Sequence, residues 1–168
     1  MNEIHLNELK ITSNITTVKE PTPVSLFNTI KKKRNKNVII KEGLSVLFDS
    51  GSSHSMILKD LVSHLSWKRL RNPVGFESCN GAFDLTHKAE VMFSLPELHS
   101  HKVITWQCYI DDRDSDDLGY DMIIGRDLMT ILGIKIDFQN KMIDWEGMEL
   151  EMKEFNSKKP TCKGSKQL

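Results

Sequence analysis

The sequence carries no net charge, because 23 lysine and arginine residues balance 23 aspartate and glutamate residues. This balance gives no overall electrostatic reason to expect binding to nucleic acid or to a membrane. No apolar stretch approaches the roughly 20 residues that span a bilayer, and the polar N-terminus lacks the apolar segment of a signal peptide. We therefore expect no membrane partner, and we do not expect the domain to bind nucleic acid.

Cysteine is scarce as well. The three cysteines, Cys79, Cys108 and Cys162, are odd in number, lie far apart and match no zinc-binding pattern. Such usage is typical of a reducing compartment, so we expect a cytoplasmic protein that needs no metal or other cofactor. A chain of 168 residues is long enough for one domain with a substantial core and too short for two large lobes.

Charge is unevenly distributed although its sum is zero. A basic run covers Lys31, Lys32, Lys33, Arg34 and Lys36, and an acidic run covers Asp111, Asp112, Asp114, Asp116 and Asp117. Both runs are typical of solvated loops. The basic run could attract RNA, but no aromatic residues are interleaved with it, so a linker is the preferred interpretation. We assign residues 1–36 to a polar, basic arm or linker with at most one short strand, residues 37–153 to the domain, and residues 154–168 to a lysine-rich tail that we expect to be disordered.

Hydrophobic periodicity in the domain predicts a mostly-β fold with one or two short helices. Residues 38–41 and 44–49, joined at Glu42-Gly43, are expected to form a β-hairpin. Leu58, Leu61, Val62 and Leu65 fall at helical spacing, which predicts a short amphipathic helix. Further strands are expected within 74–93, folded at Asn80-Gly81, and at 104–110, 122–124, 134–138, 142–145 and 148–152, with a second helix at 126–132 capped by Gly133.

One segment points to chemistry. The apolar run Val46-Leu47-Phe48 delivers Asp49 into a turn made of Ser50, Gly51, Ser52 and Ser53. Such a turn can hold a carboxylate by hydrogen bonds at the edge of a cleft. Asp, Ser and Gly clusters are also common in ordinary turns, because their side chains bond the nearby backbone and glycine tolerates positive φ. The segment alone is therefore weak evidence for catalysis.

A second motif follows downstream. Met122-Ile123-Ile124 predicts a short buried strand, and Gly125, Arg126 and Asp127 then open a helix. A plain strand-to-helix junction would look the same. Taken together, the strand ending in Asp-Ser-Gly-Ser, the glycine-tipped hairpin and Ile-Ile-Gly-Arg-Asp-Leu resemble a retropepsin, the aspartic protease of retroviruses and of gypsy-type LTR retrotransposons. The segments 132–138 and 142–145 resemble the retrotransposon branch, and the resemblance covers roughly residues 38 to 153.

The resemblance implies a closed β-barrel half that is active as a homodimer, with Asp49, Ser50 and Gly51 as the catalytic motif. Ser50 would bond across the dimer axis, and Gly51 would let the substrate backbone approach. Ser52 would bond the outer oxygen of Asp49 and favour its ionised form, which predicts an acidic pH optimum. Arg126, supported by Gly125 and Asp127, would tie the helix to the active-site turn.

The same resemblance assigns the hairpin at 78–83 as a flap that closes over bound peptide. Its substrate-facing residues would be Cys79, Asn80, Gly81, Ala82 and Phe83. Phe76, Phe83, Ile123 and Ile124 are candidates for pocket walls, and ordinary core positions are the alternative for the two isoleucines. Viral members often have an aspartate just after the position of Ser52 that contacts the helix arginine. Ser53 and His54 occupy that region here, which leaves the partner of Arg126 open.

Aspartic proteolysis needs two carboxylates that share one proton and one water. The chain has a single Asp-Ser-Gly motif, so Asp49 from each of two subunits must meet at a two-fold axis. We thus expect an aspartic endopeptidase that acts on polypeptides, such as a Gag-Pol polyprotein, in the cytoplasm or in virus-like particles. The alternative is a catalytically silent dimerisation or peptide-binding module with the same fold.

Two other readings are weaker. Ser52, His54 and Asp49 lie too close together on one turn to converge as a hydrolase triad, and no nucleophile elbow is present. His99 and His101 could face one side of a strand, but two histidines without a third ligand are usually surface residues.

Overall fold

The computed structural model describes residues 20–78, 81–113 and 119–154. The elements in chain order are β1 (Val24–Lys33), β2 (Lys36–Phe48), β3 (Met56–Leu58), the 3-10 helix η1 (Lys59–Leu61), β4 (Lys68–Ser78), β5 (Gly81–Leu95), β6 (His99–Asp111), β7 (Met122–Ile124), α2 (Arg126–Leu132), β8 (Lys135–Asp137), β9 (Met142–Trp145) and β10 (Met148–Glu151). The predicted mostly-β fold is confirmed, and within the described residues α2 is the one α-helix. No helix there is long and apolar enough to cross a membrane.

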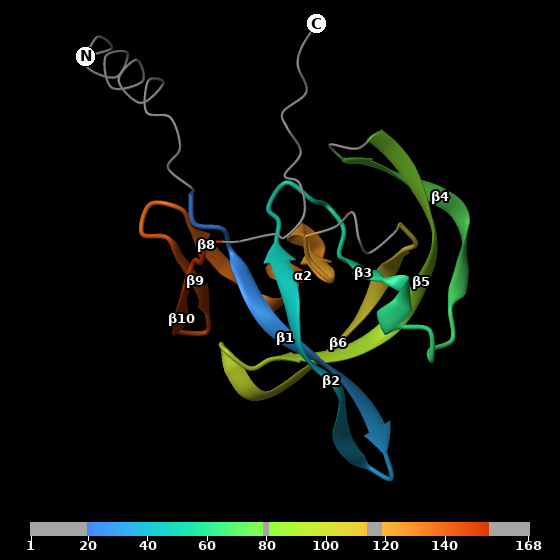
Figure 1. The fold of residues 1–168 in the computed structure, drawn as a ribbon, viewed down its shortest axis with the longest axis horizontal. Helices are drawn as coiled ribbons and strands as arrows, with labels where there is room; N and C mark the ends of the chain where they lie inside the picture. The colour runs from blue at the N-terminus through green and yellow to red at the C-terminus, as the bar shows by residue number, and fades with distance from the viewer. Residues whose placement is uncertain (1–19, 79–80, 114–118, 155–168) are drawn as a thin grey trace, which may run out of the picture.

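Six strands close into a barrel (Figure 1). The main sheet has the order β1-β2-β7-β3-β6-β5-β4, and a further pairing of β1 with β5 joins its ends. Every second side chain of this part of β5 points into the barrel. Ala89, Val91 and Phe93 are all buried, as their period-two spacing predicts. β4 lies outside the closed ring and pairs with β5 alone. The core also includes α2, β9 and the apolar residues that follow η1.

The first strand corrects the predicted domain boundary. β1 begins at Val24 and pairs with β2 along its length and with β5 at Asn28, Thr29 and Ile30. Phe27 on this strand is fully buried. Residues 24–30 therefore belong to the barrel and residues 31–33 extend the same strand, whereas the sequence pattern placed all of them in an arm or linker. These residues include few hydrophobic positions, so the sequence alone did not mark them as core. Their burial depends on the partner strands β2 and β5.

The predicted hairpin at 38–49 is wrong as well. β2 is one continuous strand of 13 residues, and Gly43 forms an irregularity within it at φ 69°. The side-chain carbonyl of Asn28 accepts the N–H of Gly43 at 3.2 Å. The chain turns instead between β1 and β2, at Arg34 and Asn35, which both have positive φ. Gly43 is a bulge in the strand because two residues there oppose a single residue of β1.

The predicted helix around Leu58 to Leu65 is reduced to a single 3-10 turn. Met56, Ile57 and Leu58 form a strand that pairs with β6 on one side and with β7 on the other. Pairing on both edges outweighs the helical spacing of the following leucines. Val62 is nonetheless fully buried, so these apolar residues do cover the core.

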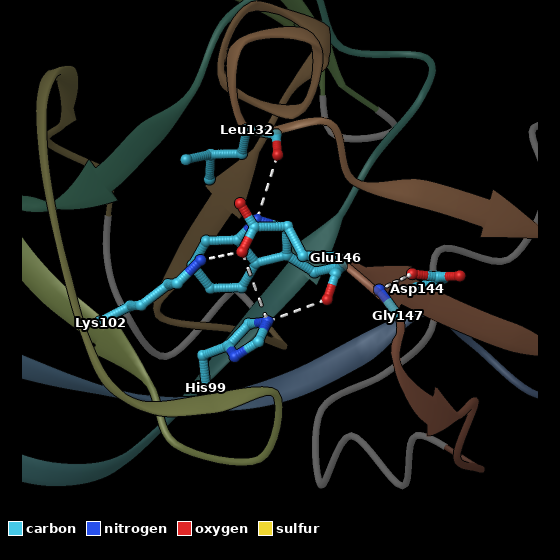
Figure 2. Close-up of polar contacts among 7 residues, drawn as sticks. His99, Lys102, Leu132, Asp144, Glu146 and Gly147 are labelled. Carbon is cyan, nitrogen blue, oxygen red and sulfur yellow. Dashed lines mark hydrogen bonds and ion pairs between the residues drawn. The ribbon is translucent and has the colours of Figure 1, made fainter.

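The C-terminal strands β8, β9 and β10 form a separate three-stranded sheet that is fixed to the barrel around Trp145. The Trp145 indole N–H donates to the carbonyl of Leu132 at 3.1 Å, and the His99 ring donates to the carbonyl of Trp145 at 3.0 Å. Glu146 pairs with Lys102 and lies 3.8 Å from the same histidine (Figure 2). These contacts hold the end of α2 against β6 and β9, and so set the position of the helix that begins at the site.

Candidate active site

The two sequence motifs are neighbours in the barrel. β2 and β7 run parallel, with Phe48 opposite Ile124, and the N–H of Asp49 donates to the carbonyl of Ile124 at 2.9 Å. Asp49 and Gly125 thus follow adjacent strands at the same edge of the sheet. Side chains that follow parallel strands at one edge lie close together, which is how a site is assembled from distant segments.

The turn after β2 presents the carboxylate of Asp49. Oδ1 of Asp49 accepts the N–H of Gly51 at 2.9 Å, and the Asp49 carbonyl accepts the N–H of Ser52 at 3.1 Å. Asp49 is half-buried, while Ser50 and Gly51 are exposed. The hydrogen bond from the Gly51 N–H orients the carboxylate. The turn therefore fixes one carboxylate at the protein surface, next to two exposed small residues.

Ser52 does not have the predicted role. Its hydroxyl donates to the carbonyl of His54 at 2.7 Å, within the turn, and its side chain is buried. The outer oxygen of Asp49 therefore receives no hydrogen bond from Ser52. The chain reverses within two residues, so the nearest acceptor for the Ser52 hydroxyl is a carbonyl of the same turn. The expected acidic pH optimum loses this support.

Arg126 contacts the turn directly. Its guanidinium donates to the carbonyl of Ser50 at 3.0 Å, and its backbone N–H donates to the carbonyl of Ser52 at 2.8 Å. A backbone carbonyl of the turn is therefore the partner that the sequence left open. Gly125 makes this approach possible, because a Cβ there would lie 2.6 Å from the carbonyl oxygen of His54.

Asp127 supports the other end of the turn. Its two carboxylate oxygens accept the hydroxyl of Ser55 at 2.7 Å and the N–H of Ser55 at 3.1 Å. The hydroxyl oxygen of Ser55 in turn accepts the N–H of Gly125 at 3.0 Å. Sequence reasoning named Asp127 but missed Ser55, which is fully buried. No local signal marks this serine, because its partner lies 72 positions away.

A cavity of about 280 Å³ opens beside Asp49. One wall is the turn from Gly51 to His54, and the other is the β4 segment Gly75, Phe76 and Glu77. β4 and β5 form the predicted hairpin, in which Ser78 pairs with Gly81. Cys79 and Asn80 lie outside the described residues, and Gly81 and Ala82 are exposed. The hairpin thus borders the cavity with its described residues.

The proposed pocket walls separate into two groups. Phe76 and Phe83 contact each other with ring centroids 5.5 Å apart, and they pack with Ile123 in a small apolar cluster. Ile124 is fully buried in the main core instead. Successive residues of a strand point to opposite faces, so only one of the two isoleucines can face the cavity side. Ile123 packs with Phe76, which lines the cavity, but Ile123 and Phe83 do not themselves line it.

Burial and neighbouring charges set the ionisation of two groups near the site. Burial raises the pKa of the Tyr120 hydroxyl; Arg113 opposes this effect, while Asp49 and Asp111 add to it. Tyr120 is therefore a neutral hydrogen-bond donor within electrostatic reach of Asp49. Burial, assisted by Asp127, also raises the pKa of the Cys108 thiol. A buried, protonated thiol is a poor nucleophile, so Cys108 is a core residue.

The acidic run is only partly a solvated loop. Asp111 ends β6, is buried, and forms a two-point ion pair with Arg113 at 2.7 and 2.9 Å. Arg113 also lies over the ring of Phe83 at 3.8 Å. Asp112 is exposed, and Asp114, Asp116 and Asp117 lie outside the described residues. In the described parts of the chain, no group of three or more potential ligands could hold a metal ion.

The fold and the site together define a mostly-β protein with a closed six-stranded barrel and an aspartate-bearing turn against a short helix. No protein-family model and no curated protein sequence matches the chain. Among solved structures it is similar to the retroviral protease-like domain of Ddi1 from Leishmania major, at 12% identity and TM-score 0.49, over 81% of this chain and 94% of that one. It is also similar to EIAV protease complexed with the inhibitor HBY-793, at 18% identity and TM-score 0.47, over 73% and 99%. A protein of unknown function from Legionella pneumophila, Lpg0085, matches at 13% identity and TM-score 0.36, over 68% and 88%.

Proposed function

We propose that this protein is an aspartic endopeptidase that acts as a homodimer. The observation that carries the proposal is the placement of Asp49. Its carboxylate stands at the end of a core strand, is oriented by the N–H of Gly51, and borders a cavity walled by the β4–β5 hairpin. The chemistry would require a second Asp49, because one carboxylate cannot act as acid and base at once.

In the proposed reaction, the two Asp49 carboxylates share one proton, since like charges this close cannot both ionise. The ionised member accepts a proton from the bound water, whose oxygen attacks the scissile carbonyl carbon. The protonated member donates its proton to the developing oxyanion. Collapse of the tetrahedral intermediate then breaks the C–N bond. The carboxyl that took the proton of the water donates it to the leaving nitrogen, and the other carboxylate takes back the proton of the diol hydroxyl, so that the pair again shares one proton. The hairpin would exclude bulk water during these steps.

The surroundings of the site favour a second copy of the chain as the source of the other carboxylate. Both carboxylate oxygens of Asp127 accept hydrogen bonds from Ser55, so Asp127 cannot act as the second catalytic carboxylate. Glu77 also lines the cavity, but it is exposed on the hairpin. A second cavity of about 420 Å³ is lined by Ser50 and Arg126 and also by Phe138, which is 54% exposed. An exposed aromatic residue beside the active-site turn suits a subunit interface.

The substrate is proposed to be a polypeptide with an apolar side chain near the scissile bond, because Phe76, Phe83 and Ile123 form an apolar cluster next to the cavity. A polyprotein of the Gag-Pol kind, processed in the cytoplasm or in a virus-like particle, is the substrate that the sequence resemblance suggests. A silent peptide-binding module would use the same surfaces without hydrolysis.

The test is cleavage of a peptide library by the native chain, by Asp49→Asn and by Glu77→Gln. We expect Asp49→Asn to lower the rate at least about 100-fold, as the loss of a general acid and base does, and Glu77→Gln to keep most of it. A pepstatin-type inhibitor should block the native chain. Peptide binding without cleavage by the native chain would identify the silent module. Equal loss in both variants would mean that Asp49 works with Glu77 within one chain.

A further inference from the structure

The outer half of the β1–β2 hairpin projects from the barrel. In Figure 1 it extends below the other strands. β1 pairs with β5 only as far as Ile30, and β2 pairs with β7 only from Val46 onward. Every residue from 31 to 43 is exposed. Beyond Ile30 the molecule is therefore a free ribbon of two strands, closed by the turn at Arg34 and Asn35.

This ribbon carries a dense positive charge. Lys31, Lys32, Lys33, Arg34 and Lys36 lie at its end, and the next acidic residue along the hairpin is Glu42. Within the described part of the chain, none of the five cations has an ion-pair partner. Lys33 lies directly opposite Lys36, a pairing of like charges that destabilises a sheet. The charges are therefore concentrated and uncompensated in a chain whose net charge is zero.

The number of charges per length of ribbon is close to that of a nucleic-acid duplex. The pairs from Lys31–Val38 to Lys33–Lys36, with the turn, occupy roughly 10 Å of ribbon. Duplex DNA carries about one phosphate charge per 1.7 Å of its axis, or about six over that length. The ribbon thus brings five cations to a length of duplex that carries about six phosphates, with Lys31 and Lys33 on one face and Lys32 on the other.

The shape of the ribbon favours double-stranded DNA over other polyanions. A two-stranded β-ribbon fits the major groove of B-form DNA, whereas the major groove of duplex RNA is too deep and narrow. Residues 31–42 contain no aromatic side chain on which single-stranded bases could stack. Three exposed apolar residues adjoin the cations: Val38 lies opposite Lys31, and Ile39 and Ile40 follow it away from the turn.

We propose that the tip of the β1–β2 hairpin binds the phosphate backbone of double-stranded DNA, without sequence specificity. This inference does not depend on the proposed protease activity, because the tip and Asp49 lie at opposite ends of β2. It revises the expectation that the domain has no nucleic-acid partner. That expectation treated the basic run as part of a linker, where its charges would not be held together.

The test uses the full chain and a fluorescent 20-base-pair DNA duplex, with binding measured by anisotropy between 50 and 200 mM salt. The native affinity is expected to fall roughly 150-fold over this range, since about four phosphate contacts give a log–log slope of about −3.6. The variant Lys31→Gln, Lys33→Gln, Arg34→Gln, Lys36→Gln should bind at least about tenfold more weakly at 50 mM salt, with a much flatter slope. Its melting temperature reports that the barrel is intact.

The matched control removes four positive charges elsewhere, as Lys59→Gln, Lys68→Gln, Arg69→Gln, Arg71→Gln, all at exposed positions. It should retain most of the affinity. If the control variant lost as much affinity for the duplex, net charge alone would explain the effect and the proposal would be overturned. The absence of duplex binding by the native chain would also overturn it. Hairpin-dependent binding to phosphatidylserine vesicles without duplex binding would assign a membrane partner instead. Single-stranded RNA bound as tightly as the duplex would rule out the fit to a groove.

Discussion

Two aspartates that lie close to the same turn differ in what surrounds their carboxylates. Asp127 accepts the N–H and the hydroxyl of Ser55, the N–H of Leu128 and, at 3.4 Å, the indole N–H of Trp106. Asp49 accepts a single N–H and borders a cavity. A carboxylate whose acceptor positions are filled by the protein is unavailable to water or substrate. Asp127 therefore positions the turn, and Asp49 is the group that can react.

Gly125 determines how closely the helix approaches this turn. In Gly125→Ala the new Cβ would lie 2.6 Å from the carbonyl oxygen of His54 and 2.8 Å from that of Ser52. Both atoms belong to the backbone and cannot move alone, so we expect a loss of about 3 kcal/mol in unfolding free energy, typical of overpacking. Urea denaturation measures it. Gly75→Ala is the matched control, because its Cβ would meet only a side-chain oxygen at 3.8 Å. Equal stability of the two variants would contradict the close approach.

At the scale of elements, strands with strict alternation and the strand-glycine-helix junction were predictable, because their signals are local. β5, β7 and α2 fall where the sequence places them, and Gly133 caps the helix in the left-handed region. Glu42-Gly43 was misread because a glycine at positive φ occurs in turns and bulges alike. The true turn, at Arg34 and Asn35, contains no glycine. The pairing of β2 with β1 determines that the chain reverses there and not at Gly43.

The candidate site was predictable to a similar degree. The motifs identify Asp49 and Arg126, and the bond from Arg126 to the turn joins residues 76 positions apart. The roles of Ser52 and Ser55 could not be read from the sequence. Both are serines of the segment 50–55, and only the folded chain shows that Ser52 bonds its own turn while Ser55 bonds Asp127. Hydroxyl partners depend on geometry finer than spacing can resolve.

Glu97 links three elements near the chain ends. It follows β5, accepts the N–H of Leu26 on β1 at 2.8 Å, and pairs with Lys153 after β10. Partial burial alone would raise the pKa of this carboxyl, but the bonds from Lys153 and Leu26 outweigh burial and lower it. The folded state thus holds the ionised form more strongly than the unfolded state does.

The stabilisation by Glu97 should therefore depend on pH. Between the lowered folded pKa and the unfolded value near 4.5, the unfolded chain binds more protons, so stability falls as pH falls. We expect the native chain to exceed Glu97→Gln by about 1 kcal/mol in unfolding free energy above pH 4.5. The gap should close as the solution is acidified below that value. Urea titrations at several pH values measure it, and a gap that stays constant down to low pH would disprove the ionic role.

At the scale of the whole molecule, closure of the barrel leaves open strand edges only on the projecting half of the β1–β2 hairpin and at the ends of the sheets, among the described strands. Pairing of β1 with β5 removes the edges of the ring, and among the described strands β4, β8 and β10 end their sheets. Open edges are natural sites for pairing with another chain. β8 lies between the helix and Phe138, and its residues line the cavity that starts at Ser50. This face therefore combines an open edge, an exposed aromatic side chain and the active-site turn.

Self-association through this face should control activity. If only the dimer holds two Asp49 carboxylates, the cleavage rate at low concentration should rise with the square of protein concentration. Phe138→Lys places a charge in the proposed interface, so we expect at least a tenfold weaker dimer, or about 1.4 kcal/mol. Met148→Lys is the control, because Met148 is similarly exposed, at 47%, on the same small sheet but does not line this cavity. Sedimentation and rate measurements over one concentration series should agree on a single dissociation constant for each variant. A rate that stays proportional to concentration where sedimentation finds only monomer would mean that a single chain is sufficient for catalysis.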